Sequence, residues 1–205
     1  MYRGRIEYRR PGKYRDPAGF GRQTGTGAAL VQEGTVRSIR RTICEDAPAV
    51  VDRVLARWQA ICDREPWWRM EHVDADHLNE LVRATADAAL RDDPDEGIAR
   101  HFVATALAHG RDRRTDGHRD TVVHQEFLLL RRALRDDLKE QFGTTPVTHR
   151  AMTRLETALS HAEIASLHGF HELDLPAEAA RNAPDRLSRE WLRVMADWPP
   201  EDIGG

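Results

Sequence analysis

Ten histidines are the first residues in this sequence that could do chemistry, because imidazole is the commonest metal ligand in proteins. A di-iron carboxylate bundle requires Glu-x-x-His, a spacing that places both ligands on one face of a helix. No histidine in the chain has a glutamate three residues before it. A metal- or haem-binding helical bundle is therefore the alternative interpretation rather than the first one. Its candidate ligands are His101, His109, His161 and His168.

The motifs of nucleophilic and nucleotide-dependent catalysis are missing from the sequence. There is no Gly-x-Ser-x-Gly elbow and no Gly-rich phosphate-binding loop between a strand and a helix. The two cysteines, Cys44 and Cys62, are too few and too far apart for a disulfide framework or a thiolate metal site. The sequence therefore predicts a protein that is not an enzyme and that has neither catalytic residues nor a resident cofactor.

A second group of polar residues lies within a segment of helical periodicity. His109 and Arg113 are four residues apart, on one face of a helix, and Gly117 follows one turn later. A buried cation needs an acceptor, and Glu126 in the next helix is the best candidate if that helix returns antiparallel after Gly117. Gly110 costs up to about 1 kcal/mol relative to Ala in a helix, which indicates that another helix approaches closely there.

This segment resembles the N-terminal sensory domain of RsbT co-antagonist proteins, the RsbR and RsbRD type found in stressosomes. In that family a helix ends in His-Gly-x-x-Arg-x-x-x-Gly, and the next helix carries Glu followed by a Leu-Arg-Arg-like run. The matching residues here are His109, Gly110, Arg113, Gly117, Glu126, Leu130, Arg131 and Arg132. The resemblance spans about residues 44–172.

The resemblance implies a bacterial signalling protein of the stress response, with a helical, dimeric, globin-like sensor domain that has neither haem nor catalysis. In the family this domain usually precedes an antagonist domain or a kinase. The chain after Phe170 is too short for such an output domain, so we expect a stand-alone module whose signal leaves through a protein partner or the N-terminal segment.

Two interpretations of the polar cluster stay open at this point. One is a buried ion pair that fixes the register of the helices, and the other is a site for a small anionic ligand. The predicted members of the cluster are His109, Arg113, Glu126 and Arg131.

The elements that must position these residues follow from apolar residues that recur at steps of three and four. The periodicity predicts five main helices, over about residues 46–66, 74–91, 95–114, 118–142 and 146–171. Pro176 and Pro184 are expected to bound a loop before a short helix over residues 187–195. The predicted fold is all-α, a single globin-like helical bundle, with a sensory domain at 34–172 and a C-terminal loop and short helix at 173–205.

An N-terminal arm, residues 1–33, differs from the rest of the chain in charge and composition. Residues 1–43 carry ten basic and three acidic side chains, so the formal net charge of −3 divides into +7 there and −10 in residues 44–205. The arm is rich in Gly and Pro, and we expect it to be disordered or extended. Nucleic-acid association through this arm is a further alternative, because tyrosines stack on bases and arginines pair with phosphates. The candidate contacts are Tyr2, Arg3, Tyr8, Arg9, Tyr14 and Arg15.

The remaining composition bears on where the protein acts. No apolar run approaches the roughly 20 residues of a transmembrane helix, and the N-terminus lacks the apolar stretch of a signal peptide. Composition thus predicts a cytoplasmic protein that does not contact a membrane, and the resemblance implies a homodimer that contacts a signalling protein.

Overall fold

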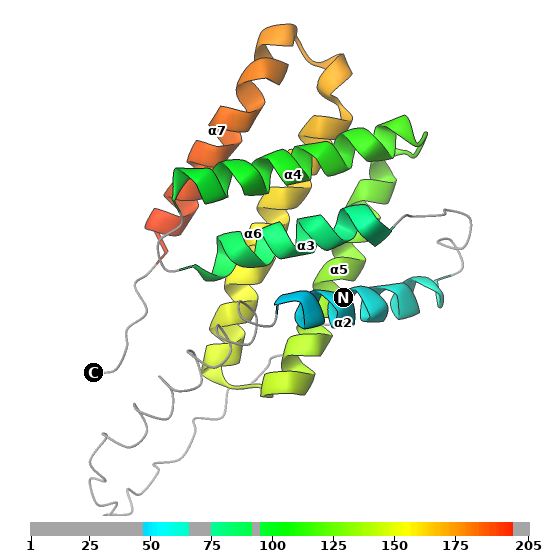
Figure 1. The fold of residues 1–205 in the computed structure, drawn as a ribbon, viewed down its shortest axis with the longest axis vertical. Coiled ribbons are helices and arrows are strands. Elements are labelled where there is room, and N and C mark those ends of the chain that lie inside the picture. The colour runs from blue at the N-terminus through cyan, green and yellow to red at the C-terminus, as the bar shows by residue number, and fades with distance from the viewer. Residues whose placement is uncertain (1–46, 66–74, 92–94, 199–205) are drawn as a thin grey trace, which may run out of the picture.

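The computed structural model describes residues 47–65, 75–91 and 95–198, and Figure 1 shows that these ranges form a bundle of helices. The helices are α2 (Ala47–Cys62), α3 (Ala75–Leu90), α4 (Glu96–Thr115), α5 (Asp120–Phe142), α6 (Pro146–Phe170), the short 3-10 helix η2 (Glu172–Asp174) and α7 (Ala177–Ala196). No strand occurs within the described ranges, so the prediction of an all-α fold is confirmed for them.

Local sequence sets the ends of α4, α5 and α6 within two residues of the predicted positions. The Asp95 side chain accepts a hydrogen bond from the backbone N–H of Ile98 at 2.8 Å and so caps the start of α4. Gly117 and Gly143 follow α4 and α5 with φ angles of 82° and 68°. Only glycine adopts this left-handed backbone without a steric penalty, which is why the helices stop there.

The prediction for the C-terminal helix is wrong, because α7 begins ten residues earlier than expected and contains Pro184. A proline inside a helix removes one backbone hydrogen bond and costs about 3 kcal/mol. Ala183, Leu187, Trp191 and Met195 recur every four residues and are all buried, so the helix gains a continuous apolar stripe that crosses the proline. Burial of this stripe offsets the loss at Pro184.

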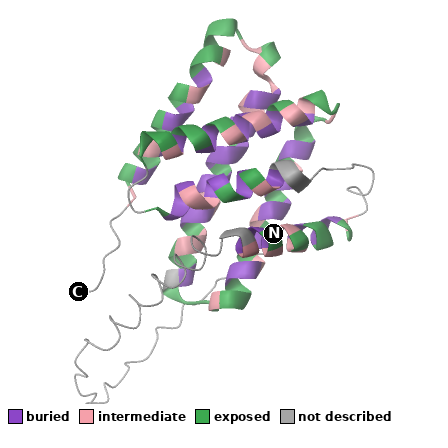
Figure 2. Ribbon diagram, in the orientation of Figure 1, coloured by how far each residue is buried: buried purple, intermediate pink, exposed green. Residues whose placement is uncertain are grey.

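The core lies between two sets of helices that run in different directions. In Figure 1 the long helices α5 and α6 run antiparallel, α2, α3 and α4 cross over them, and α7 packs beside α4. Figure 2 shows that the inward stripe of each helix is buried and the outward stripe exposed. The largest fully buried apolar side chains include Trp58, Phe102, Phe127 and Trp191.

The crossing of α4 and α6 is unusually close because glycine occupies the contact on both helices. A Cβ atom added at Gly110 would lie 1.8 Å from the carbonyl oxygen of Ser166, and one added at Gly169 would lie 2.0 Å from that of Leu107. The Ser166 hydroxyl donates to the carbonyl of Ala106 at 2.8 Å across the same contact. The predicted close approach at Gly110 is therefore confirmed, and it fixes the orientation of the α4 face that carries His109.

Candidate functional site

The polar cluster is built by the C-terminal half of α4 and the first two turns of α5. His109 and Arg113 lie one turn apart on α4, and Glu126 lies on the side of α5 that faces them. The expected antiparallel return of α5 alongside α4 is not what the structure shows, since α4 packs mainly on α6 and meets α5 near the turn (Figure 1). Proximity to the turn at Gly117 is sufficient to bring Glu126 to both α4 side chains.

The Glu126 carboxylate binds both partners, one on each oxygen. Arg113 donates from Nε to Oε1 at 2.9 Å, and the His109 ring nitrogen Nε2 lies 3.1 Å from Oε2. Because an ionised carboxylate only accepts hydrogen bonds, Nε2 is the protonated nitrogen of His109. Arg113 also reaches Asp116, with 3.4 Å between Nη1 and Oδ2. The acceptor predicted for the buried cation is therefore present.

The burial of its three side chains limits the access of a ligand to this cluster. The side chains of His109, Arg113 and Glu126 are each 1% exposed. The Nδ1 atom of His109 has no hydrogen-bond partner among the described residues, and the ring lies edge-on to Phe127 with 6.0 Å between centroids. The charges of Arg113 and Glu126 compensate each other in a closed environment, so this geometry acts as a helix junction and presents no open position to a ligand.

Arg131, the fourth predicted member, does not join the cluster. It lies on α5 and pairs with Glu163 of α6, with 2.5 Å between Nη2 and Oε2, and its second contact is Ser160 at 3.3 Å. His124 binds the other oxygen of Glu163. Glu163 therefore organises a separate, partly buried group between α5 and α6, on the outer side of that helix pair.

The four histidines considered as metal or haem ligands are held by different neighbours. His101 is exposed and lies 3.7 Å from Glu80, and His168 accepts a hydrogen bond from Arg186 at 3.1 Å. His161 donates from Nε2 to the Leu187 carbonyl at 2.9 Å. Among the described residues, no three His, Cys, Asp or Glu side chains come together in a way that could hold a metal ion.

His161 lies in an aromatic environment between α4 and α7. Its ring centroid is 6.0 Å from that of Phe102 and 5.5 Å from that of Trp191. Burial lowers the pKa of His161, and the hydrogen bond to the Leu187 carbonyl opposes this effect only in part. The neutral imidazole is thus the form that packs α7 onto the bundle.

Cys62 is the cysteine that the structure describes, at the end of α2, and it is fully buried. Burial is the main cause that raises the pKa of its thiol to about 12. The thiol is therefore protonated at neutral pH and is a poor nucleophile.

Several other ionic contacts were not predicted from the sequence, including one to Asp137 and one to Glu172. Asp137 of α5 is buried and lies 3.3 Å from Arg53 Nε of α2. Arg111 at the end of α4 binds Glu172 of η2, and this hydrogen bond holds the pKa of Glu172 below its ordinary value. Helical spacing places each of these residues on a face, but only the packed bundle shows which opposite charge it meets.

The N-terminal arm, with Tyr2, Arg3, Tyr8, Arg9, Tyr14 and Arg15, lies outside the described residues. Within the described part of the chain, no helix combines the length and apolar character needed to cross a membrane. Comparison with models of known protein families, with characterised proteins and with solved structures found no match to this chain.

Proposed function

We propose that this chain is a regulatory helical module that acts through protein contacts, without catalysis of its own, as the resemblance to stressosome sensory domains implies. The residues that carry this resemblance support the proposal by their role in the fold. Gly110 allows α6 to cross α4, while His109 and Arg113 on neighbouring positions bind Glu126 of α5. These residues thus connect α4, α5 and α6 inside the bundle. The outer surface of the helices is left for contacts with another protein.

The observation that carries the proposal is a pair of exposed aliphatic side chains on the outer face of α5 and α6. Leu128 is 54% exposed and Ile164 is 50% exposed, and both belong to the few large apolar side chains at the described surface. The contact of Arg131 with Ser160 fixes the antiparallel register, and this register places Leu128 and Ile164 at the same level. In this proposal Leu128 and Ile164 form the apolar centre of the contact surface.

The charges around this apolar pair suit contact with a second copy of the chain. Glu163 is bound by Arg131, and Glu156 by Arg135, so both signs alternate along the α5/α6 face. A twofold dimer interface must be complementary to itself, and a patch with an apolar centre and both charge signs meets that condition. Since these ion pairs are satisfied within one chain, their desolvation does not leave a single buried charge.

The test is the oligomeric state of the full chain, measured by size-exclusion chromatography with light scattering. We expect a dimer for the wild type, and monomers for Leu128→Asp and Ile164→Asp, because each substitution places two charges in the centre of the interface. Leu173→Asp is the matched control, since Leu173 is 84% exposed and lies on η2, beyond the end of α6. It should remain dimeric.

The regulatory part of the proposal needs a test inside cells. A photo-crosslinking amino acid at position 128 should form adducts with a second copy and with a regulatory protein, whereas one at position 173 should not. A monomeric wild type, or equal crosslinking at both positions, would contradict action through this face.

A further inference from the structure

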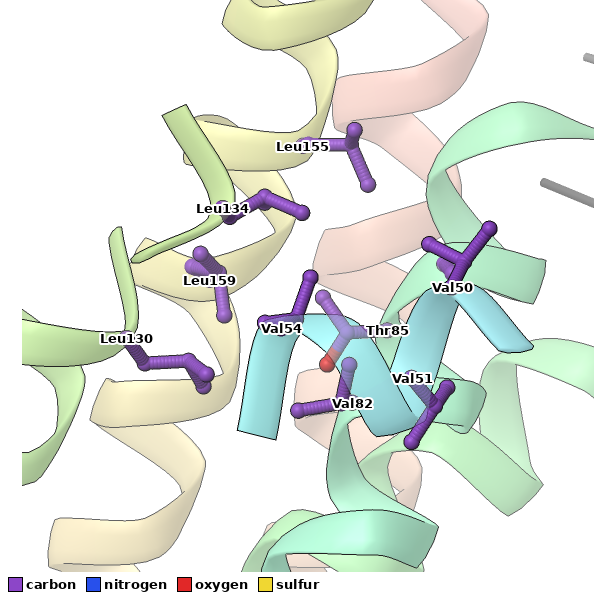
Figure 3. Close-up of a pocket in the computed structure, with 10 residues that line it drawn as sticks. Val50, Val51, Val54, Val82, Thr85, Leu130, Leu134, Leu155 and Leu159 are labelled. Carbon is purple, nitrogen blue, oxygen red and sulfur yellow. The ribbon is translucent and has the colours of Figure 1, made fainter. Parts of the chain in front are cut away.

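A small pocket lies where four helices meet, away from the polar cluster. Figure 3 shows the side chains of α2, α3, α5 and α6 converging on it. The residues that line it are Val50, Val51, Val54, Val82, Thr85, Ala86, Leu130, Leu134, Leu155 and Leu159. Nothing in the proposed regulatory role uses this space.

The described lining residues are aliphatic except for Thr85. Thr85 carries the one side-chain oxygen in the lining set, and its hydroxyl donates to the Leu81 carbonyl of its own helix at 2.6 Å. That hydrogen bond leaves the hydroxyl without a free donor for a ligand. Among the described lining residues, only the acceptor lone pairs of this hydroxyl remain for a guest, so a charged headgroup or a molecule that needs several hydrogen bonds is disfavoured.

The size of the pocket restricts its occupant further. Its cavity volume is about 20 Å³. A cavity of about 10–15 Å³ is needed to hold one buried water, and the water also needs two to four polar partners. The volume exceeds that required for a single water, but the described lining residues do not supply the two to four polar partners that a water requires. An occupant must be small, uncharged and apolar.

We propose that this pocket binds dissolved apolar gas molecules of the size of dioxygen. Apolar cavities lined by aliphatic side chains remain dry and take up apolar guests. Dioxygen forms only weak hydrogen bonds, so it loses little when it leaves water for such a site, and the surrounding methyl groups supply dispersion contacts. The proposal stands on the lining and the size of the pocket, independently of the regulatory role proposed above.

Dioxygen itself is the probe, because it is paramagnetic and accelerates the relaxation of nearby methyl groups in NMR spectra. The full chain with labelled methyl groups is compared under pressurised oxygen and under nitrogen at the same pressure. We expect the methyl groups of Val54 and Leu130 to relax several-fold faster than those of Val103 and Leu187, which are equally buried elsewhere in the core. Equal enhancement in all four residues would overturn the proposal, since dioxygen would then only be diffusing through the core.

A variant in which the pocket is filled by a larger side chain provides a second test of the proposal. Val54→Ile adds one methylene group to the wall and should reduce the oxygen-dependent relaxation of Leu130 and Leu134 to the level of the rest of the core. Val194→Ile is the matched control, because Val194 lies at the exposed surface of α7 and the same group is added there. If Val54→Ile does not fold, Val82→Ile fills the same pocket from α3. Unchanged relaxation in a folded filling variant would refute the site.

Discussion

Replacement of Arg113 by alanine tests whether the polar cluster holds the bundle together. In the native protein the Glu126 carboxylate is 1% exposed and accepts from Arg113 at 2.9 Å. Arg113→Ala leaves this carboxylate buried without its cationic partner. Breaking a buried ion pair in this way costs about 3–5 kcal/mol, which is a large part of the roughly 5–15 kcal/mol that stabilises a typical domain.

The measurement is unfolding by urea, followed by circular dichroism, in a double-mutant cycle. Arg113→Ala and Glu126→Ala each leave one buried charge, whereas the double variant leaves neither. The double variant should therefore lose at least about 2 kcal/mol less than the sum of the two single losses. The control is Arg111→Ala, since Arg111 lies in the same helix but pairs at the surface with Glu172, and its removal should cost less than about 1 kcal/mol.

The outcome that refutes this reasoning is a variant that unfolds like the wild type. If Arg113→Ala and Arg111→Ala have the same midpoint of unfolding, the cluster does not stabilise the junction. A site that exchanges with solvent and binds a small anion would then be the better interpretation of His109, Arg113 and Glu126.

Four further predictions concern other parts of the molecule. Gly110→Ala should lower the stability by at least about 2 kcal/mol in thermal unfolding, because its Cβ would meet the Ser166 carbonyl, whereas Gly97→Ala, which meets only a side-chain oxygen at 3.1 Å, should be tolerated. Burial lowers the pKa of His161 in the folded protein below its ordinary 6.5. As the pH falls, His161 is therefore protonated in the unfolded chain before it is protonated in the folded protein, which favours unfolding. The melting temperature should therefore drop between pH 7.5 and pH values below 6, and less so in His161→Phe. Elemental analysis of the purified protein should find no stoichiometric metal, and an absorbance spectrum should show no haem. Full-length protein and a form without residues 1–27 should bind nucleic acid equally weakly, and a salt-sensitive affinity lost on deletion would instead make the arm a nucleic-acid tail.

Much of the helical framework could be predicted because it depends on local chemistry. The stripe of Val123, Phe127, Leu130 and Leu134 indicates the buried face of α5, and all four are buried in the structure. The pairing of His109 and Arg113 with Glu126 could also be inferred, since one helical turn separates the first two and the third lies within two helical turns of the start of the next helix. The extent of α7 could not be predicted, because a proline in the sequence is a signal for the end of a helix. The helix continues through Pro184 because its apolar stripe is buried against other helices, and this packing depends on the tertiary structure.

The sequence by itself determined which residues share a face, because the period of a helix is set by its own backbone hydrogen bonds. It also determined that a glycine in α4 would lie against another helix. Only the tertiary structure decided that this helix is α6, that Arg131 binds Glu163 rather than Glu126, and that four helices leave a small, largely apolar pocket between them. The physical reason is that the distance and angle between two packed helices depend on all the side chains at their crossing. The spacing of residues along one helix does not contain this information.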